Sequence, residues 1–265
     1  MAQETLDNRT TDREERRPPA IVAEGVRKWF PLRKGRRSSL TLLKNRILGR
    51  NEEPKQFFAV DGIDLTVQRG EKIGLIGNNG AGKTSLLKLL SGLYRPTSGT
   101  IRVRGDMTLL SGLGIGMLDE LTLEQNVYLY GAIYGMHHEE TCTRLPEILA
   151  WAGLEDFSGT MLKTLSKGMR TRLAFSITRH IKTDICLLDE ALSGGDGTFR
   201  EKCLEVLSSY RDSSRTYIVS SHNMDFVRHL CGRTLWLHHG KQMAFDETEL
   251  VLEQYAEFNG TPAKS

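Results

Sequence analysis

The sequence feature that most constrains the fold is a glycine-rich segment that runs from Gly77 to Thr84 and reads GNNGAGKT. It follows a short apolar run at 72–76, and the leucine-rich run 85–90 continues from it as a helix. Glycines let successive backbone N–H groups point at phosphate oxygens, and the following helix adds its positive amino end. The spacing G-x-x-x-x-G-K-[ST] between a strand and a helix therefore predicts a phosphate-binding loop in an α/β fold.

Two side chains at the end of this loop carry the chemistry that a nucleotide needs. The Lys83 ammonium is expected to reach the β- and γ-phosphates, and the Thr84 hydroxyl to bind Mg²⁺. A chance lysine in a glycine-rich turn is the competing interpretation, and the flanking strand and helix argue against it. The residues expected to surround the phosphates are Gly77, Asn78, Asn79, Gly80, Ala81, Gly82, Lys83, Thr84 and Ser85.

A second acidic site follows the apolar run 185–188, which ends in Asp189 and Glu190. An acid at the carboxyl end of a parallel strand lies at the edge of the sheet where ligands bind. There Asp189 is expected to hold Mg²⁺ through water, because Mg²⁺ keeps several of its waters in proteins. Glu190 is expected to be the catalytic base that orients and deprotonates the attacking water. Alone, an Asp-Glu pair could equally begin a helix, so this prediction depends on the phosphate loop.

The rest of the chain alternates between strand-like and helix-like runs, which predicts an α/β fold around a mostly parallel sheet. Residues 113–181 are predicted to form a helical subdomain inserted into the sheet domain. A polar, disordered tail is expected at 1–19, a domain at 20–258 and a C-terminal tail at 259–265. Strands are expected at 21–23, 59–60, 63–67, 72–76, 184–188, 215–220 and 233–238, and helices at 83–91, 122–135, 139–152, 166–181 and 197–210.

Composition argues against several classes of protein. The chain has 36 Lys plus Arg against 33 Asp plus Glu, a formal net charge of only +3, which gives no reason to expect nucleic acid as a partner. The longest run without a formal charge, 125–138, is too short and too polar to span a bilayer, and the charged N-terminus argues against a signal peptide. Four scattered cysteines fit reduced thiols and argue against a disulfide scaffold or a CxxC metal site.

Three further motifs, taken in chain order with the two above, resemble those of the ATPase subunits of ABC transporters. The segment 165–175, LSKGMRTRLAF, resembles the signature motif of that family, 193–196 resembles its D-loop, and 220–222 its switch histidine. The resemblance covers residues 21–257. It implies a P-loop ABC ATPase domain with a mostly parallel core sheet, an antiparallel β subdomain and an inserted helical subdomain. It also implies an ATPase with ATP and Mg²⁺ as its cofactors.

The resemblance assigns roles to further side chains. His222 joins Lys83 and Glu190 as a catalytic residue. An aromatic ring near the adenine is expected from Trp29 or Phe30; Phe30 matches the family position better, and Trp29 could equally be a core aromatic. Two copies are expected to stack head to tail, with each ATP between the loop of one and the signature motif of the other. The nucleotide contacts implied outside the loop are Phe30, Ser166, Gly168 and Asp196, and the metal ligands are Thr84 and Asp189.

Local patterns resemble more narrowly the ATPases of polysaccharide and O-antigen exporters, which move lipid-linked glycans such as O-antigen, capsule or teichoic acid. These patterns are 113–116, 120–122, Asn126-Val127, 166–175, 195–203, 230–231 and a long insertion before Ala59. The implied protein is peripheral to the cytoplasmic face of the cell membrane and works as a homodimer with two integral-membrane permease subunits. The alternatives are an ATPase for another substrate such as a drug, a soluble ABC protein, or an inactive nucleotide-sensing scaffold.

Two features depart from the family pattern or extend it. Gly112 and Leu113 stand where most ABC ATPases carry a glutamine that touches Mg²⁺ and the membrane partner, so no such glutamine is assigned. Residues 27–50 hold nine Lys or Arg and no acid, and apolar spacing around Leu40 hints at a short amphipathic helix. This basic insertion is either a solvated loop or a surface for anionic lipid headgroups or for the diphosphate of a lipid-linked glycan headgroup.

Overall fold

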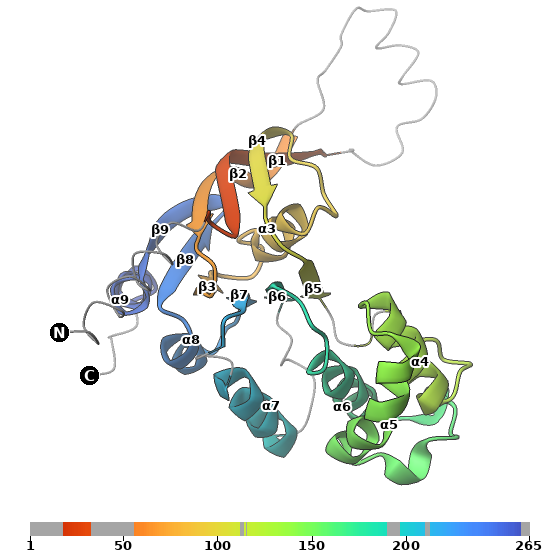
Figure 1. The fold of residues 1–265 in the computed structure, drawn as a ribbon. Coiled ribbons are helices and arrows are strands. Elements are labelled where there is room, and N and C mark those ends of the chain that lie inside the picture. Colours follow the sequence, from red (N-terminus) through yellow and green to blue (C-terminus); the bar gives the residue numbers. More distant parts are fainter. Residues whose placement is uncertain are drawn as a thin grey trace, which may run out of the picture.

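Two β-sheets form the centre of the molecule, and helices lie between them, below the larger sheet and at both sides (Figure 1). A computed structural model describes residues 18–32, 56–111, 114, 116–189, 197–209 and 213–260. The larger sheet has six strands in the order β5-β6-β7-β3-β8-β9, and the smaller sheet has three in the order β2-β1-β4. The predicted α/β class, with a mostly parallel core sheet and a separate antiparallel sheet, is confirmed.

The six-stranded sheet is parallel except at one edge, where β9 pairs antiparallel with β8. Its strands are β3 (Lys72–Ile76), β5 (Met107–Ser111), β6 (Ile185–Asp189), β7 (Thr216–Ser220), β8 (Arg233–His238) and β9 (Lys241–Glu247). The carboxyl ends of the parallel strands meet at one edge, which is where open α/β sheets bind their ligands. The residues that follow β3, β6 and β7 are therefore the ones that the fold brings together.

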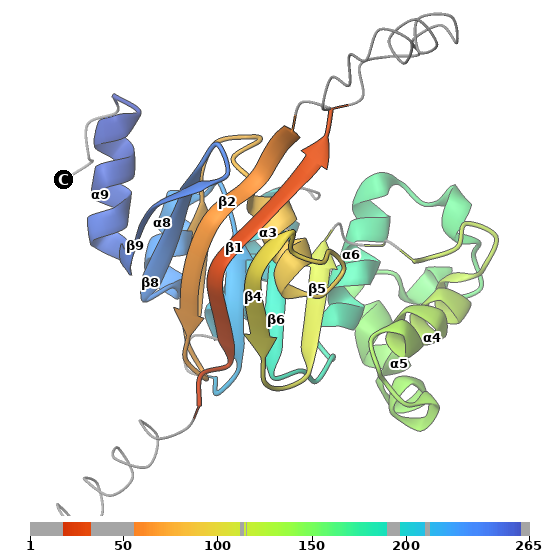
Figure 2. The same ribbon diagram turned by 90° about the horizontal axis from the view of Figure 1, so that it is seen from above.

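The antiparallel sheet consists of β1 (Ile21–Pro31), β2 (Gln56–Val67) and β4 (Ser98–Val103). Its central strand, β1, pairs with β2 on one side and β4 on the other. In Figure 2 this sheet lies as a layer across the parallel strands, with helix α3 (Lys83–Leu90) between the two. The phosphate loop, which precedes α3, therefore starts inside the sandwich of the two sheets.

The boundary of the predicted basic insertion was wrong, because β1 extends to residue 31 and includes Arg27 and Lys28. Both side chains contact polar groups of the fold itself. Arg27 Nε lies 3.1 Å from the carboxylate of Asp61, and Lys28 Nζ donates to the carbonyl of Arg95 at 2.9 Å. The other seven basic residues, and the short helix predicted near Leu40, lie outside the described residues; they are Arg33, Lys34, Arg36, Arg37, Lys44, Arg46 and Arg50.

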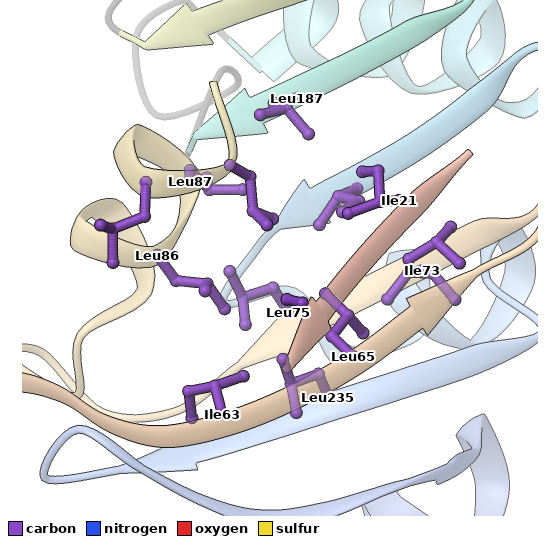
Figure 3. Packing of buried hydrophobic residues seen from close by; sticks show 14 of the residues in the cluster. Ile21, Ile63, Leu65, Ile73, Leu75, Leu86, Leu87, Leu187 and Leu235 are labelled. Carbon is purple, nitrogen blue, oxygen red and sulfur yellow. The ribbon is translucent and has the colours of Figure 1, made fainter. Parts of the chain in front are cut away.

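The main core lies between the two sheets and is filled from α3. Leu86 and Leu87 of α3 are fully buried, and they face Leu75 from β3 and Ile63 from β2 (Figure 3). Burying a leucine side chain in this way contributes roughly 1.5–3 kcal/mol. Because α3 begins directly at Lys83, the packing of its leucines fixes where the lysine lies.

Three helices, α4 (Leu123–Ile133), α5 (His138–Ala152) and α6 (Lys167–Thr178), form a cluster of their own beside the parallel sheet (Figure 1). Two short 3-10 helices, η1 (Glu155–Phe157) and η2 (Leu162–Thr164), connect α5 to α6. The predicted helices at 122–135, 139–152 and 166–181 correspond to α4, α5 and α6; α5 ends where expected, whereas α4 and α6 both end earlier. The cluster is held by its own buried residues, among them Leu123, Ile148 and Leu173.

The other face of the parallel sheet is covered by α7 (Gly197–Ser209), α8 (Met224–Leu230) and α9 (Thr248–Phe258), as their shared apolar cluster with β6, β7 and β8 indicates. Strands β4, β5 and β9 and helix α8 were not predicted, since each is short or lies at a sheet edge with charged residues in it. No helix in the described ranges is both long enough and apolar enough to cross a bilayer.

Candidate functional site

The loop 77–82, between β3 and α3, is held by backbone contacts from two directions. At Gly77 (φ 142°) a β-carbon would lie 2.3 Å from the carbonyl oxygen of Leu237 on β8. At Gly82 (φ 109°) it would lie 2.4 Å from the carbonyl oxygen of Ala59 on β2. Both the backbone angle and the available space therefore require glycine at these two positions. The path of the loop is set by the strands on either side of it.

Lys83, the first residue of α3, is only 6% exposed. Its Nζ donates to the carbonyl of Gly77 at 2.7 Å and approaches that of Asn78 at 3.4 Å. The carbonyl of Asn78 also accepts the N–H of Ala81 at 3.0 Å, which closes a turn within the loop. The ammonium is thus held against the loop itself, where the amino end of α3 adds a second positive contribution.

A cavity of about 360 Å³ opens beside the loop. Its walls are Phe57 and Ala59 of β2 and the residues 79–85, so they include Thr84, which is exposed, and Ser85, which is half-buried. The volume lies in the range of about 300–1,000 Å³ that is usual for small-molecule sites. A cavity with a glycine-rich backbone on one side and an aromatic ring on another suits a ligand with a phosphate end and a flat ring end.

The aromatic wall of this cavity is Phe57, and sequence reasoning missed it. Phe57 is 50% exposed, and it lines the cavity together with Ala59 of the same strand. The predicted adenine contact, Phe30, pairs with Phe57 across β1 and β2 but is not among the cavity walls. Its ring packs edge-on against Tyr94, with 5.7 Å between centroids, and Lys28 Nζ lies 5.2 Å from its centre. Only the pairing of the two strands reveals that Phe57 lies beside the loop.

Asp189 is the last residue of β6 and lies at the predicted sheet edge, 9% exposed. Its neighbours in register are Ser111 of β5 and Ser220 of β7. The Ser220 hydroxyl is buried and has no hydrogen-bond partner within the part of the chain that the structure describes. Polar oxygen atoms at this edge, together with the Thr84 hydroxyl, are hard donors of the kind that Mg²⁺ accepts.

Among the described residues there is no group of three or more His, Cys, Asp or Glu that could bind a metal ion by itself. Mg²⁺ is held in proteins by one or two carboxylates with water and phosphate oxygens. Cys186, Cys203 and Cys231 are buried, and burial raises the pKa of each thiol to about 12, whereas Cys142 is exposed. All four cysteines are free thiols in the structure.

Two predicted site residues, Glu190 and Asp196, lie outside the described residues. His222 follows β7 by two residues and is exposed. Because β6 and β7 are adjacent and parallel, His222 and Asp189 belong to the same edge of the sheet. The fold therefore places three of the predicted residues, Lys83, Asp189 and His222, at the carboxyl ends of neighbouring strands.

The predicted signature residues lie on α6, in the helical cluster. Ser166 caps this helix, because its hydroxyl accepts the N–H of Met169 at 3.2 Å, and the side chain is exposed. The simple interpretation of Ser166 as a helix cap is thus correct as far as it goes. Neither Ser166 nor Gly168 is among the walls of the cavity beside the phosphate loop. One chain does not bring these two residues and the loop into one cavity in its described part.

The comparison with families of known proteins agrees with these features. The family model described as ABC transporter matches residues 60–193, which is half of the chain. That stretch contains the phosphate loop, α6 and Asp189.

Curated relatives are similar over most of this chain. The teichoic acids export ATP-binding protein TagH of Levilactobacillus brevis is 38% identical over 208 residues, which cover 78% of this chain and 57% of that protein. The TagH protein of Listeria innocua is 33% identical, over 82% of this chain and 64% of its own length. The ABC transporter protein AbcA of Aeromonas salmonicida is 36% identical, over 89% of this chain and 76% of its own. The chain thus spans less than two thirds of the length of these TagH relatives.

Solved structures share the fold. A structure titled as the ATP-binding subunit of an ABC transporter aligns with a TM-score of 0.68 at 21% identity, over 93% of this chain and 95% of that one. A dimeric, post-hydrolysis structure of the ATP-binding cassette MJ0796 with ADP and Pi aligns with a TM-score of 0.67 at 20% identity, over 86% and 98%. At this identity the likeness concerns the arrangement of strands and helices.

Proposed function

Because the chain belongs to the ABC transporter family, we propose that it is the ATP-hydrolysing subunit of an exporter of lipid-linked cell-wall glycans. The observation that carries the ATPase part is the cavity beside the phosphate loop, with Lys83 held at its base and Asp189 on the adjacent sheet edge. The substrate class is supported by the relatives named for teichoic acid export. Among transporter ATPases this support favours a glycan over a drug or another small molecule.

Each side chain in this proposal has one task. The backbone N–H groups of the loop and Lys83 bind the phosphates, while Thr84 and Asp189 hold Mg²⁺, which neutralises phosphate charge. Glu190 orients the attacking water and accepts its proton, and His222 stabilises the γ-phosphate end of the site. Catalysis by this arrangement is positioning and electrostatic stabilisation, without a covalent intermediate.

A second copy of the chain completes the site in this proposal. Ser166 and Gly168 of one copy contact the nucleotide bound at the loop of the other, together with Asp196 from the segment between β6 and α7. The exposed amino end of α6, which the cavity of its own chain does not include, supports this arrangement. ATP then bridges two copies, so its binding closes the pair and its hydrolysis lets the pair open.

The partners of this pair are two integral-membrane permease subunits, at the cytoplasmic face of the cell membrane. The unit that we assign to the ATPase is 20–258, with the helical subdomain at 113–181, tails at 1–19 and 259–265, and the basic insertion before β2. In this proposal the basic insertion binds the diphosphate of a lipid-linked glycan or the headgroups of anionic lipids.

The experiment that tests the ATPase part compares Lys83→Ala with Lys241→Ala, a substitution of an exposed lysine on β9 that lines no part of the cavity. Wild type and Lys241→Ala are expected to bind and hydrolyse MgATP, and Lys83→Ala to lose binding. Calorimetry and phosphate release measure the two steps. Equal affinity of Lys83→Ala and wild type would show that the loop is not the nucleotide site.

The substrate class needs a separate test in cells. Deleting the gene is expected to leave lipid-linked glycan at the inner side of the membrane, and wild type is expected to restore glycan at the surface. Lys241→Ala should restore it equally, and Lys83→Ala should not. Normal surface glycan in the deleted strain would contradict the export proposal and leave the ATPase proposal standing.

A further inference from the structure

Helix α9 reaches the phosphate loop from the end of the described chain. The hydroxyl of Tyr255 on α9 donates to the side-chain oxygen of Asn78, the second residue of the loop, at 2.9 Å. The two residues are 177 positions apart in the sequence. Neither residue type nor spacing in the sequence predicts this contact. This side-chain hydrogen bond joins the loop to a helix other than α3.

The packing of α9 fixes the position of the Tyr255 hydroxyl. The Tyr255 ring lies edge-on to Trp236 of β8, with 5.5 Å between centroids, and Trp236 is buried. Phe258, one turn further along α9, contacts the same tryptophan at 5.2 Å. Val251 and Leu252 anchor the amino-terminal half of the helix in the core. A tyrosine held by such contacts presents its hydroxyl at a defined point, so little conformational entropy is lost when the hydrogen bond forms.

The Asn78 side chain gains a defined orientation from this bond. An asparagine amide has an oxygen that accepts and a nitrogen that donates, and its two flipped forms have nearly the same shape. Since Tyr255 donates, the oxygen faces α9 and the NH₂ group faces away from it. Burial raises the pKa of Tyr255, so the hydroxyl stays a proton donor through the neutral range.

The backbone of the same residue shapes the loop. The carbonyl of Asn78 accepts the N–H of Ala81 at 3.0 Å and lies 3.4 Å from Lys83 Nζ. A shift of Asn78 therefore changes the turn that aims the loop's N–H groups, as well as one of the contacts of the lysine. The hydrogen bond from α9 therefore acts on Asn78, the residue whose carbonyl shapes both the turn of the loop and one contact of Lys83.

We propose that Tyr255 is a positioning residue that ties α9 to the phosphate loop through Asn78, so that nucleotide binding and the seating of α9 stabilise each other. This inference rests on the proposed function. A coupling of this kind is reciprocal: whatever moves α9 changes the affinity of the loop for nucleotide by the same factor as nucleotide changes the seating of α9. Helix α9 is thereby a route for regulating the ATPase from the C-terminal side.

The test substitutes Tyr255→Phe, which keeps the ring on Trp236 and removes only the hydroxyl. The matched control is Tyr128→Phe, the same chemical change at a half-buried ring on α4, in the separate helical cluster (Figure 2). MgATP affinity is measured by calorimetry on the full chain. Tyr255→Phe is expected to weaken it about 2- to 10-fold, the size of one net hydrogen bond, and Tyr128→Phe to leave it unchanged.

Two further readouts separate positioning from a purely structural role. In an Asn78→Ala background, Tyr255→Phe is expected to add no further loss of affinity, because the partner of the hydroxyl is gone. In wild type, MgATP is expected to slow amide hydrogen exchange in 248–258, and this protection should be absent in Tyr255→Phe.

The results that overturn the inference are distinct from those that overturn the function. If wild type and Tyr255→Phe bind MgATP equally and show the same protection of α9, the coupling does not exist. A lower melting temperature with unchanged affinity and protection would make the bond structural only and would also overturn it. If wild type binds no MgATP, the proposed function fails, and the inference fails with it.

Discussion

The phosphate loop and the amino end of α6 both place glycine at the start of a helix. The surrounding structure requires glycine at the first position but not at the second. At Gly82 a β-carbon would lie 2.4 Å from the carbonyl oxygen of Ala59, so the chain's own backbone demands glycine. At Gly168 the nearest atom, the hydroxyl oxygen of Ser166, would be 3.9 Å from such a β-carbon, and φ is not positive. Nothing within the described chain requires glycine at 168.

The difference shows which half of the site is complete. The loop is shaped by β2, β8 and α9 of its own chain and buries its lysine. The amino end of α6 is capped by the Ser166 side chain, and Ser166 and Lys167 are exposed in the part of the chain that the structure describes. Its small residues are therefore suited to a surface that something else approaches, and in our account that is the nucleotide on a second copy.

The largest effect expected is on the chemical step. Glu190→Gln removes the proton acceptor but no phosphate contact, so hydrolysis is expected to fall about 10²- to 10⁴-fold while MgATP binding is kept. Single-turnover phosphate release and calorimetry measure the two. The control is Glu205→Gln, an exposed glutamate on α7. Hydrolysis within about threefold of wild type would remove Glu190 from the proposed mechanism.

The next effect tests the loop half of the comparison. Gly82→Ala places a β-carbon against the backbone of β2 at a positive φ, a strain of about 1–3 kcal/mol. We expect MgATP affinity to fall about tenfold or more, since 1.4 kcal/mol is a factor of ten. The matched substitution Gly80→Ala also has a positive φ but meets open space, so it should cost less affinity. Equal losses of affinity for Gly82→Ala and Gly80→Ala would show that the close approach of Gly82 to the backbone of β2 does not shape the loop.

The signature half should respond differently to the same change. Gly168→Ala is expected to leave folding intact, and to stabilise α6 by up to about 1 kcal/mol because alanine is the better helix former. MgATP binding should be unchanged while hydrolysis falls, because the extra methyl group meets the other copy. Thermal unfolding, calorimetry and phosphate release give the three values. Unchanged hydrolysis would mean that the amino end of α6 touches no nucleotide.

The smallest effect sharpens the description of the aromatic wall. Phe57→Ala is expected to raise the Michaelis constant for MgATP several-fold, about 0.5–1.5 kcal/mol of ring contact, with little change in turnover. Phe30→Ala is the comparison, since its ring packs on Tyr94 and not at the cavity. If Phe30→Ala has the larger effect on the Michaelis constant and Phe57→Ala has none, the family position was the better guide.

The sequence was informative wherever local chemistry decides the structure. The phosphate loop, the buried strand ending at Asp189 and the Ser166 cap are short patterns whose physical meaning does not depend on distant residues. The resemblance also drew attention to Asn126, but gave no reason for it. The structure supplies one: its fully buried amide accepts from the N–H of Leu118 at 2.8 Å and donates to carbonyls of Leu118 and Thr122 at 2.9 and 3.0 Å.

What the sequence did not reveal depends on pairing between distant segments. Phe57 lines the cavity because β2 pairs with β1 and runs past the loop, and Tyr255 meets Asn78 because β8 lies between α9 and β3. Neither position can be predicted from the hydrophobic period or from the spacing of motifs in the sequence. The extension of β1 through Arg27 and Lys28 was missed for a similar reason, since basic residues in a strand look like a loop until their partners are known.

The central claim is that one working site needs the loop of one copy and the α6 end of another. The most direct test mixes two inactive variants, Lys83→Ala and Ser166→Arg, and measures single-turnover hydrolysis of MgATP. In a mixed pair, the intact loop of the Ser166→Arg copy faces the intact α6 end of the Lys83→Ala copy. The account predicts that each variant alone is inactive and that the mixture regains hydrolysis, which increases with protein concentration. A mixture as inactive as its components, or full activity of Ser166→Arg alone, would contradict it.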